Sequence, residues 1–202
     1  ITTKQFWLLS ISFPLGAFAN QSILAHQVAF FVDQGMEALF ASYIVGVVGI
    51  ASVGGKILWG TLSDRIGREV TYTAGIACLI CGMIFLIVLP VHHSPILPLF
   101  YGVFFGMGYA VLAALPPIIT ADFFEGRGYG GIFGTLILIN GVGGASGAWF
   151  AGFFHDRVGS YVPVFIIMIG CVLFACLNIW RAAPRKIRNV PGKRGNPIRQ
   201  HN

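Results

Sequence analysis

The chain has 202 residues, of which 56% are hydrophobic and 10% are charged, and its net charge is +6. A soluble domain carries about 25% charged residues. Disordered, collagen-like and disulfide-scaffold proteins need polarity, periodic glycine or paired cysteines that this composition lacks. The apolar content instead approaches that of six membrane spans of about 20 residues each. We therefore expect an all-α integral membrane protein with six transmembrane helices in the lipid bilayer.

Six apolar runs of helix length follow one another, separated by charges or turn residues. They cover residues 6–32, 38–62, 70–89, 96–124, 129–154 and 161–180. The fourth run contains Pro116 and Pro117, which lack amide donors and are expected to kink or end its helix. The sequence predicts a six-helix transmembrane bundle over residues 1–181 and a basic cytoplasmic tail over residues 182–202.

The basic residues lie almost entirely on one set of predicted loops and in the tail. Residues 181–202 hold seven Arg and Lys and no acidic residue, and Arg157 stands alone on the opposite predicted side. Four further basic residues share the side of the tail, namely Lys4, Arg65, Arg68 and Arg127. The positive-inside rule predicts that both termini are cytoplasmic, and we expect the chain in the plasma (inner) membrane. The tail then faces lipid headgroups, and we expect no nucleic-acid partner.

Glycines spaced four residues apart predict close packing of helices. Small residues let two backbones approach in lipid, where no hydrophobic effect drives the helices together. The pairs are Gly102 and Gly106, Gly130 and Gly134, and Gly143 and Gly147.

A motif of glycine and charged residues occurs twice, 92 residues apart. The first copy is Gly60-x3-Asp64-Arg65-x-Gly67 and the second is Gly152-x3-Asp156-Arg157-x-Gly159, with Gly55 and Gly147 at the same offset. The interval contains three predicted spans, so the two copies lie on opposite sides of the membrane. This predicts two inverted three-helix repeats, an architecture found in secondary transporters.

The first copy, extended to Arg68, resembles the signature loop of the major facilitator superfamily, which follows the second helix of each six-helix half. Residues 116–161 are similar to the last helices of the monocarboxylate and oxalate–formate transporter branch. The resemblance implies that the chain corresponds to the seventh to twelfth helices of a twelve-helix transporter. An N-terminal six-helix half, a partner chain or a second copy is then the missing partner. Glu69 departs from the family pattern, which has a further basic residue there.

The signature loop is expected to act as a latch between helices that slide during transport. Its gating residues are Gly60, Asp64, Arg65, Gly67 and Arg68. The glycines permit a tight turn, the aspartate can accept from free amides at a helix N-terminus, and the arginines can pair with acids such as Asp122 or Glu125. The alternative is that these charges only fix the topology.

Lys56 is a charged residue inside a predicted span. Inserting such a side chain into a membrane costs about 2.5 to 3.5 kcal/mol unless it is paired or hydrated. It lies four residues before Gly60, where organic-anion members of the family place an arginine that contacts a substrate carboxylate. The resemblance therefore implies an anion-binding cation, and the alternative is that Lys56 snorkels to the cytoplasmic surface. Ser52 stands where proton-coupled monocarboxylate carriers have an aspartate. Without that aspartate, transport is coupled through another group, proceeds by exchange of anions (antiport instead of symport), or is not coupled at all.

The first span is unusually polar for a membrane helix. At 100° per residue, Asn20 and Gln27 share one face, and Ser22 and His26 lie nearly opposite. All four line one cavity only if the helix is broken there. We predict Asn20 and Gln27 as substrate-binding residues and His26 as a coupling candidate, with a structural hydrogen bond to a neighbouring span as its alternative. Asn140 is either a further substrate-binding residue or an interhelical donor.

These features predict secondary active transport of a small organic anion, a monocarboxylate or dicarboxylate, by alternating access. The alternative is a non-transporting membrane receptor or assembly subunit with the same bundle. No polar cluster combines a nucleophile, a base and an oxyanion donor, so we expect no enzyme and no catalytic residue. We expect no cofactor and no metal, since Cys78 and Cys81 form a C-x-x-C pair without a second pair of ligands.

Overall fold

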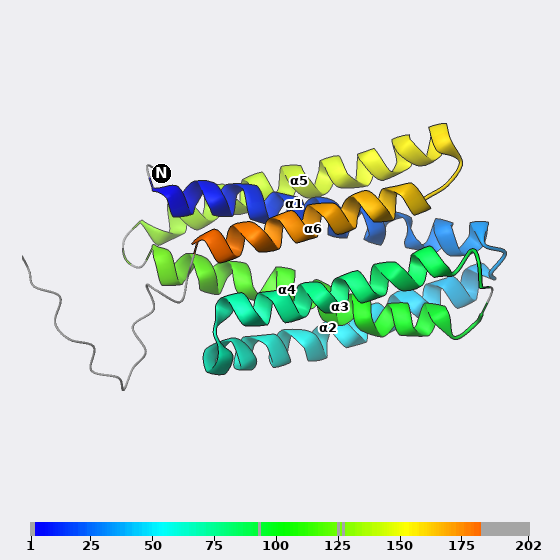
Figure 1. Cartoon of the computed structure of the whole chain (residues 1–202), viewed down its shortest axis with the longest axis horizontal. Coiled ribbons are helices and arrows are strands. Elements are labelled where there is room, and N and C mark those ends of the chain that lie inside the picture. Colours follow the sequence, from blue (N-terminus) through cyan, green and yellow to red (C-terminus); the bar gives the residue numbers. More distant parts are fainter. Residues whose placement is uncertain (1–2, 93, 125, 127, 183–202) are drawn as a thin grey trace, which may run out of the picture.

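The computed structural model describes residues 3–92, 94–124, 126 and 128–182. These residues form six α-helices, which are α1 (Lys4–Asp33), α2 (Ala38–Ile66), α3 (Arg68–Val88), α4 (Leu97–Phe123), α5 (Tyr129–Val158) and α6 (Val162–Ala182) (Figure 1). Each helix is long and apolar enough to cross a membrane. The predicted all-α fold with six spans is confirmed. The basic tail from residue 183 onward lies outside the described residues, as do Glu125 and Arg127.

The helices extend beyond the apolar runs at several ends. The second and fifth helices continue four residues past the predicted spans, to Ile66 and Val158, because polar residues also satisfy their backbone groups best within a helix at the edge of the hydrocarbon. The helix α4 passes through Pro116 and Pro117 and continues to Phe123. The two prolines therefore do not end this helix.

The six helices pack as two groups of three. Figure 1 shows α1, α5 and α6 side by side, and α2, α3 and α4 side by side, with helix contacts between α3 and α6 and between α1 and α2 joining the groups. Within the groups, α1 packs on α5 and α6, and α4 packs on α2 and α3. The first and fourth helices thus lie centrally, each against two partners of its own group. The arrangement as two inverted repeats stays a prediction.

Glycines allow the tightest of these helix crossings. A methyl group placed on Gly147 of α5 would overlap the carbonyl group of Phe18 of α1, and one placed on Gly106 of α4 would lie 2.5 Å from the carbonyl oxygen of Val48 of α2. The packing predicted for two of the three glycine pairs is confirmed at these crossings. Gly130 and Gly134 have no neighbour within 4 Å of such a methyl group in the described part of the chain, so their packing is not confirmed.

Candidate functional site

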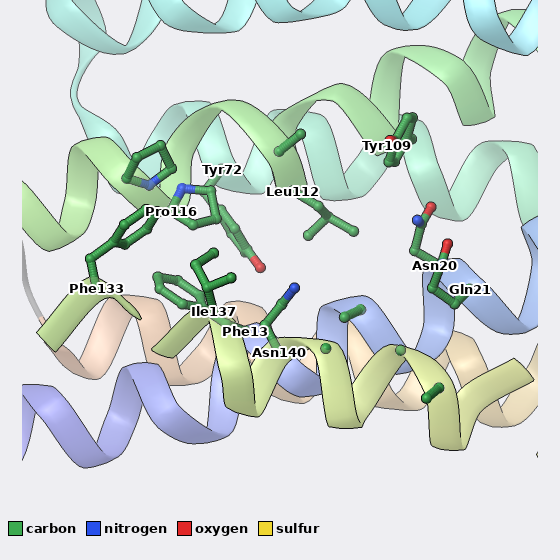
Figure 2. Close-up of a pocket in the computed structure, with 16 residues that line it drawn as sticks. Phe13, Asn20, Gln21, Tyr72, Tyr109, Leu112, Pro116, Phe133, Ile137 and Asn140 are labelled. Carbon is green, nitrogen blue, oxygen red and sulfur yellow. The ribbon is translucent and has the colours of Figure 1, made fainter. Parts of the chain in front are cut away.

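A cavity of about 550 Å³ lies between α1, α4 and α5 (Figure 2). Its lining residues come from the middle of these helices, and one comes from α3. The polar side chains in its wall are Asn20, Gln21, Tyr72, Tyr109 and Asn140. The rest of the wall is aliphatic and aromatic and includes Phe13 and Phe133. An apolar wall with a few polar groups is typical of a small-molecule site.

Asn20 and Asn140 line the same cavity from different helices. Figure 2 shows the Asn140 amide pointing from α5 toward α4. Asn20 on α1 is only 5% exposed, and its Oδ1 atom has no hydrogen-bond partner among the described residues. Two of the predicted substrate-binding residues are therefore brought together, and Asn140 takes the cavity position that was one of its two alternatives.

Tyr72, Tyr109 and Gln21 are cavity residues that the sequence did not predict. Tyr72 reaches the cavity from α3, and its hydroxyl group ends in the open space of Figure 2. The usable sequence signal was a tyrosine inside an apolar span, where the hydroxyl group must find a partner away from water. With eighteen Phe and six Tyr in the chain, aromatic content alone did not single out these two.

Lys56 adds a positive charge beside this cavity. Its side chain is exposed on α2, and its Nζ atom lies 5.6 Å from the centroid of the Tyr109 ring, within the range of a cation–π interaction. Tyr109 lies near the middle of α4 (Leu97–Phe123). The ammonium group is thus held at the level of the cavity and not at an end of the bundle. None of the described residues that line the cavity is itself charged.

Gln27 and His26 are engaged outside the cavity. The Oε1 atom of Gln27 accepts a hydrogen bond from the Tyr101 hydroxyl group at 2.7 Å. The Nε2 atom of His26 lies 2.9 Å from the carbonyl oxygen of Ala148, and its Nδ1 atom lies 3.2 Å from the hydroxyl group of Tyr161. The helix α1 is continuous through this stretch, so its two polar faces contact α4 and α5 separately, as the helical wheel predicts.

Replacing His26 by leucine should lower the thermal stability and leave the pH dependence of transport unchanged. The variant loses two hydrogen bonds, one to Ala148 of α5 and one to Tyr161 in the segment before α6, at about 1 kcal/mol each. The measurements are a melting curve in detergent and the rate of uptake as a function of pH. His92→Leu, at an exposed position, is the control and should change neither. A shifted pH profile in His26→Leu alone would instead support the coupling role.

Arg68 ties three helices together at the end of the bundle where α2 meets α3. Its side chain is only 7% exposed, although it is charged. The Nε atom donates to Asp122 of α4 at 2.9 Å, and Nη1 donates to Asp64 at 2.8 Å and to Ser63 at 2.6 Å. The predicted pairing of Arg68 with Asp122 is confirmed. Arg65 is exposed, and the predicted acceptance by Asp64 from helix amides stays a prediction.

The turn in the signature motif is made by Gly67 alone. This residue has φ = 100° and is the single residue between α2 and α3, a conformation that residues with a side chain rarely adopt. Gly60, Asp64 and Arg65 lie within α2. The expectation that Gly60 also shapes the turn is therefore wrong, because the helix continues through this position with regular geometry.

A second polar cluster lies where α1 and α5 end. The Nε2 atom of His155 is 3.4 Å from Oδ2 of Asp33, and the His155 ring stacks on that of Tyr161 with centroids 3.9 Å apart. Burial raises the pKa of Tyr161, and the negative charges of Asp33 and Asp156 raise it further. In the described part of the chain, no three His, Cys, Asp or Glu side chains gather to hold a metal ion.

Comparison with known proteins identifies a transporter family. The sequence profile of the Major Facilitator Superfamily matches residues 5–200. The chain is 22% identical over 182 residues to monocarboxylate transporter 12 of Rattus norvegicus, which covers 86% of the chain and 36% of that protein. It is 28% identical over 149 residues to monocarboxylate transporter 13 of Bos taurus, covering 70% of the chain and 33% of that protein.

Fungal carriers are similar to the same region. The chain is 26% identical over 198 residues to MFS-type transporter 1 of an Ophiocordyceps species, covering 91% of the chain and 41% of that protein. The chain thus spans roughly a third to two fifths of the length of these relatives.

Proposed function

Because the chain belongs to the Major Facilitator Superfamily, we propose that it forms one six-helix half of a carrier that moves a small organic anion by alternating access. A monocarboxylate or a dicarboxylate is the expected substrate. The chain is an integral membrane protein of a transporter family. We further propose that it lies in the plasma (inner) membrane with both termini cytoplasmic, since Lys4, Arg65 and Arg68 lie at one end of the bundle and Arg157 at the other.

The observation that carries this proposal is the position of Lys56 beside the cavity. A positive charge held in hydrocarbon is costly unless an opposite charge or water meets it. Its Nζ atom lies against Tyr109, which lines the cavity together with Asn20 and Asn140. Amide and hydroxyl groups can orient a carboxylate while the ammonium group supplies the charge. The names of two similar proteins, monocarboxylate transporters 12 and 13, support the same substrate class.

The proposed site is completed by a second six-helix bundle. In secondary transporters built from repeats, the substrate lies near the midplane between the repeats. Lys56 is exposed on α2, as are Val53 about one turn earlier and the adjacent residue Ile57. A partner half that covers this surface would enclose the ammonium group. The length of the relatives, which extends well beyond this chain, supports such a half.

We propose that the Arg68 cluster is the latch of the alternating-access cycle. It joins the ends of α2, α3 and α4 through Asp64 and Asp122. Two helices can slide past each other only if these bonds break and re-form. The inverted repeat is supported by Gly67 and Gly159, which are 92 residues apart and both have positive φ angles, of 100° and 72°.

Counterflow in proteoliposomes tests the proposed function. Vesicles that contain the purified complete protein are loaded with unlabelled pyruvate, and entry of labelled pyruvate, lactate or succinate from outside is followed. We expect transient accumulation of at least one label above equilibrium, because the unlabelled substrate inside competes with the label for exit through the same carrier site. Protein-free vesicles are the control. Saturable binding without any counterflow would contradict transport and favour the receptor alternative.

A further inference from the structure

Side chains hold α1 and α5 together where the two helices end, whereas backbone contact holds them nearer their middle. A methyl group placed on Gly147 of α5 would overlap the carbonyl group of Phe18 of α1. Further along α5, the described atoms of other helices that lie within 4 Å of a methyl group on Gly152 belong only to the imidazole ring of His26. The two backbones are therefore close at Gly147 and further apart toward their ends.

His155 links the ends of the two helices. Its Nε2 atom lies 3.4 Å from Oδ2 of Asp33, the last residue of α1. This separation is within the range of an ion pair but longer than the distance of about 2.7 to 2.9 Å in a charge-assisted hydrogen bond. The side chains of His155 and Asp33 are 27% and 48% exposed, so water and protons reach both. The pair can therefore tighten or loosen as the imidazole ring gains or loses a proton.

The two copies of the repeated motif use different cations. In the first copy, Arg68 joins the end of α2 to Asp122 of α4. At the offset of 92 residues, Ser160 takes the place of Arg68, and the side chain that joins the end of α5 to Asp33 of α1 is His155. Arginine keeps its charge at any working pH, whereas histidine changes its charge between about pH 5 and 8. The ion pair at one end of the bundle is thus permanent, and the one at the other end depends on a proton.

We infer that His155 and Asp33 form a proton-dependent latch between α5 and α1, at the end of the bundle opposite Arg68 (Figure 1). With both ring nitrogens protonated, the imidazolium group attracts the Asp33 carboxylate and draws the helix ends together. The neutral ring lacks this attraction, so the helix ends move apart. The crossing at Gly147 lies eight residues before His155, about 12 Å along the helix, and serves as the pivot. Acid therefore closes this end of the bundle.

The other titratable groups that face this pair come from three elements. They are His26 of α1, Asp156 of α5 and Tyr161 before α6. His26 is satisfied as a neutral ring, because Nε2 donates to a backbone carbonyl oxygen and Nδ1 accepts from the Tyr161 hydroxyl group. Asp156 lies 4.0 Å from Nδ1 of His155 but is 83% exposed, so solvent screens its charge. Asp33 is therefore the carboxylate on which the latch depends.

The distance between the ends of α1 and α5 tests this inference. The complete protein is purified into lipid nanodiscs with nitroxide labels at Val32 of α1 and Val158 of α5, which are 44% and 53% exposed. The labels are attached to a non-natural amino acid, so that the native cysteines stay. Double electron–electron resonance then records the distance distribution from about pH 5 to pH 8, the range in which histidine changes its charge.

We expect two populations of distances, because the latch is either closed or open. The ratio of the short to the long population should rise by roughly 2- to 5-fold between about pH 8 and pH 5, the shift expected of a partly exposed ion pair. The sign follows from the charges, since the Asp33 carboxylate attracts the ring only after His155 has gained its second proton.

Four variants assign the response to residues. His155→Gln keeps a polar side chain that cannot gain a proton, and Asp33→Asn keeps the shape of the carboxylate without its charge. In both, the distance distribution should no longer depend on pH. The matched controls are Asp156→Asn, which removes the neighbouring exposed carboxylate, and His92→Gln, which removes an exposed histidine outside the cluster. Both should keep the full response.

The labelled but otherwise unsubstituted protein decides the inference even if a variant does not fold. A distance distribution that is the same at every pH overturns the latch. So does a response that persists in folded His155→Gln, or one that is lost in Asp156→Asn and kept in Asp33→Asn. No substrate is used, so failure of the latch leaves the proposed carrier function intact, and absence of counterflow leaves the latch intact. In a carrier, such a latch makes opening toward this side depend on the pH there.

Discussion

Replacing Lys56 by alanine should lower carboxylate uptake by roughly 10- to 150-fold, since a hydrogen bond to a charged group contributes about 1.5 to 3 kcal/mol. The change removes the ammonium group that lies 5.6 Å from the Tyr109 ring beside the cavity. It also removes a charge from an apolar helix, so membrane insertion should be no less favourable than in the unsubstituted protein. The measurement is the initial rate of uptake per amount of folded protein in proteoliposomes. Lys56→Arg should retain part of the activity because it keeps the positive charge.

Arg157 provides a matched control for this substitution. Its guanidinium carbon lies 4.3 Å from the centroid of the Phe153 ring, so it is also a cation over an aromatic ring. It is exposed and does not line the cavity. Arg157→Ala should leave uptake unchanged. If Lys56→Ala also transports normally, Lys56 serves only to reach the membrane surface, and the assignment of an anionic substrate fails.

Replacing Asp122 by alanine should destabilise the protein by roughly 3 kcal/mol, because it leaves a buried guanidinium group without its main counter-charge. The Arg68 side chain is 7% exposed and Asp122 is 16% exposed, whereas its other partner, Asp64, is 62% exposed. The remaining pair of Arg68 with the exposed Asp64 is screened by solvent, so it compensates little for the loss of the Asp122 charge. The measurement is the thermal unfolding of the purified protein in detergent.

Arg65 is the matched control for this cluster. It lies in the same motif, three residues before Arg68, but its side chain is exposed. Arg65→Ala should change the stability by less than about 0.5 kcal/mol. If Asp122→Ala and Arg65→Ala have the same melting temperature, the buried contacts of Arg68 do not contribute to the stability of the protein. The latch proposal would then lose its structural basis.

The apolar runs of the sequence were sufficient to predict the six helices. Each backbone group in hydrocarbon must be paired within its own segment, so an uncharged run of about 20 residues has essentially one available structure. The same principle explains the error at Gly60. A glycine tolerates the helix as well as a turn, and nothing local shows that α2 continues to Ile66. Of the two glycines predicted to form the turn, only Gly67 has a positive φ, the conformation that a side chain would disfavour sterically.

The candidate site was only partly predictable. Asn20 was selected as a polar residue in an apolar span, and it does line the cavity. Gln27 was selected on the same ground, but Tyr101 of α4 satisfies it elsewhere. The two differ because Gln27 meets a partner more than 70 residues away in the sequence, whereas the Oδ1 atom of Asn20 has no partner among the described residues. Tyr72 went unnoticed because its route to the cavity depends on the packing of α3 against α4 and α1.

The sequence by itself determined that the chain crosses a membrane six times, that its charges favour one side, and that it carries a transporter motif. These properties depend on composition and on local spacing, which a single chain displays directly. The tertiary structure decided which polar groups share a cavity, which are paired, and that Arg68 is buried while Arg65 is not. The physical reason is that the rotation of each helix about its axis is set by backbone contacts, such as that of Gly147 with Phe18, between segments far apart in the chain.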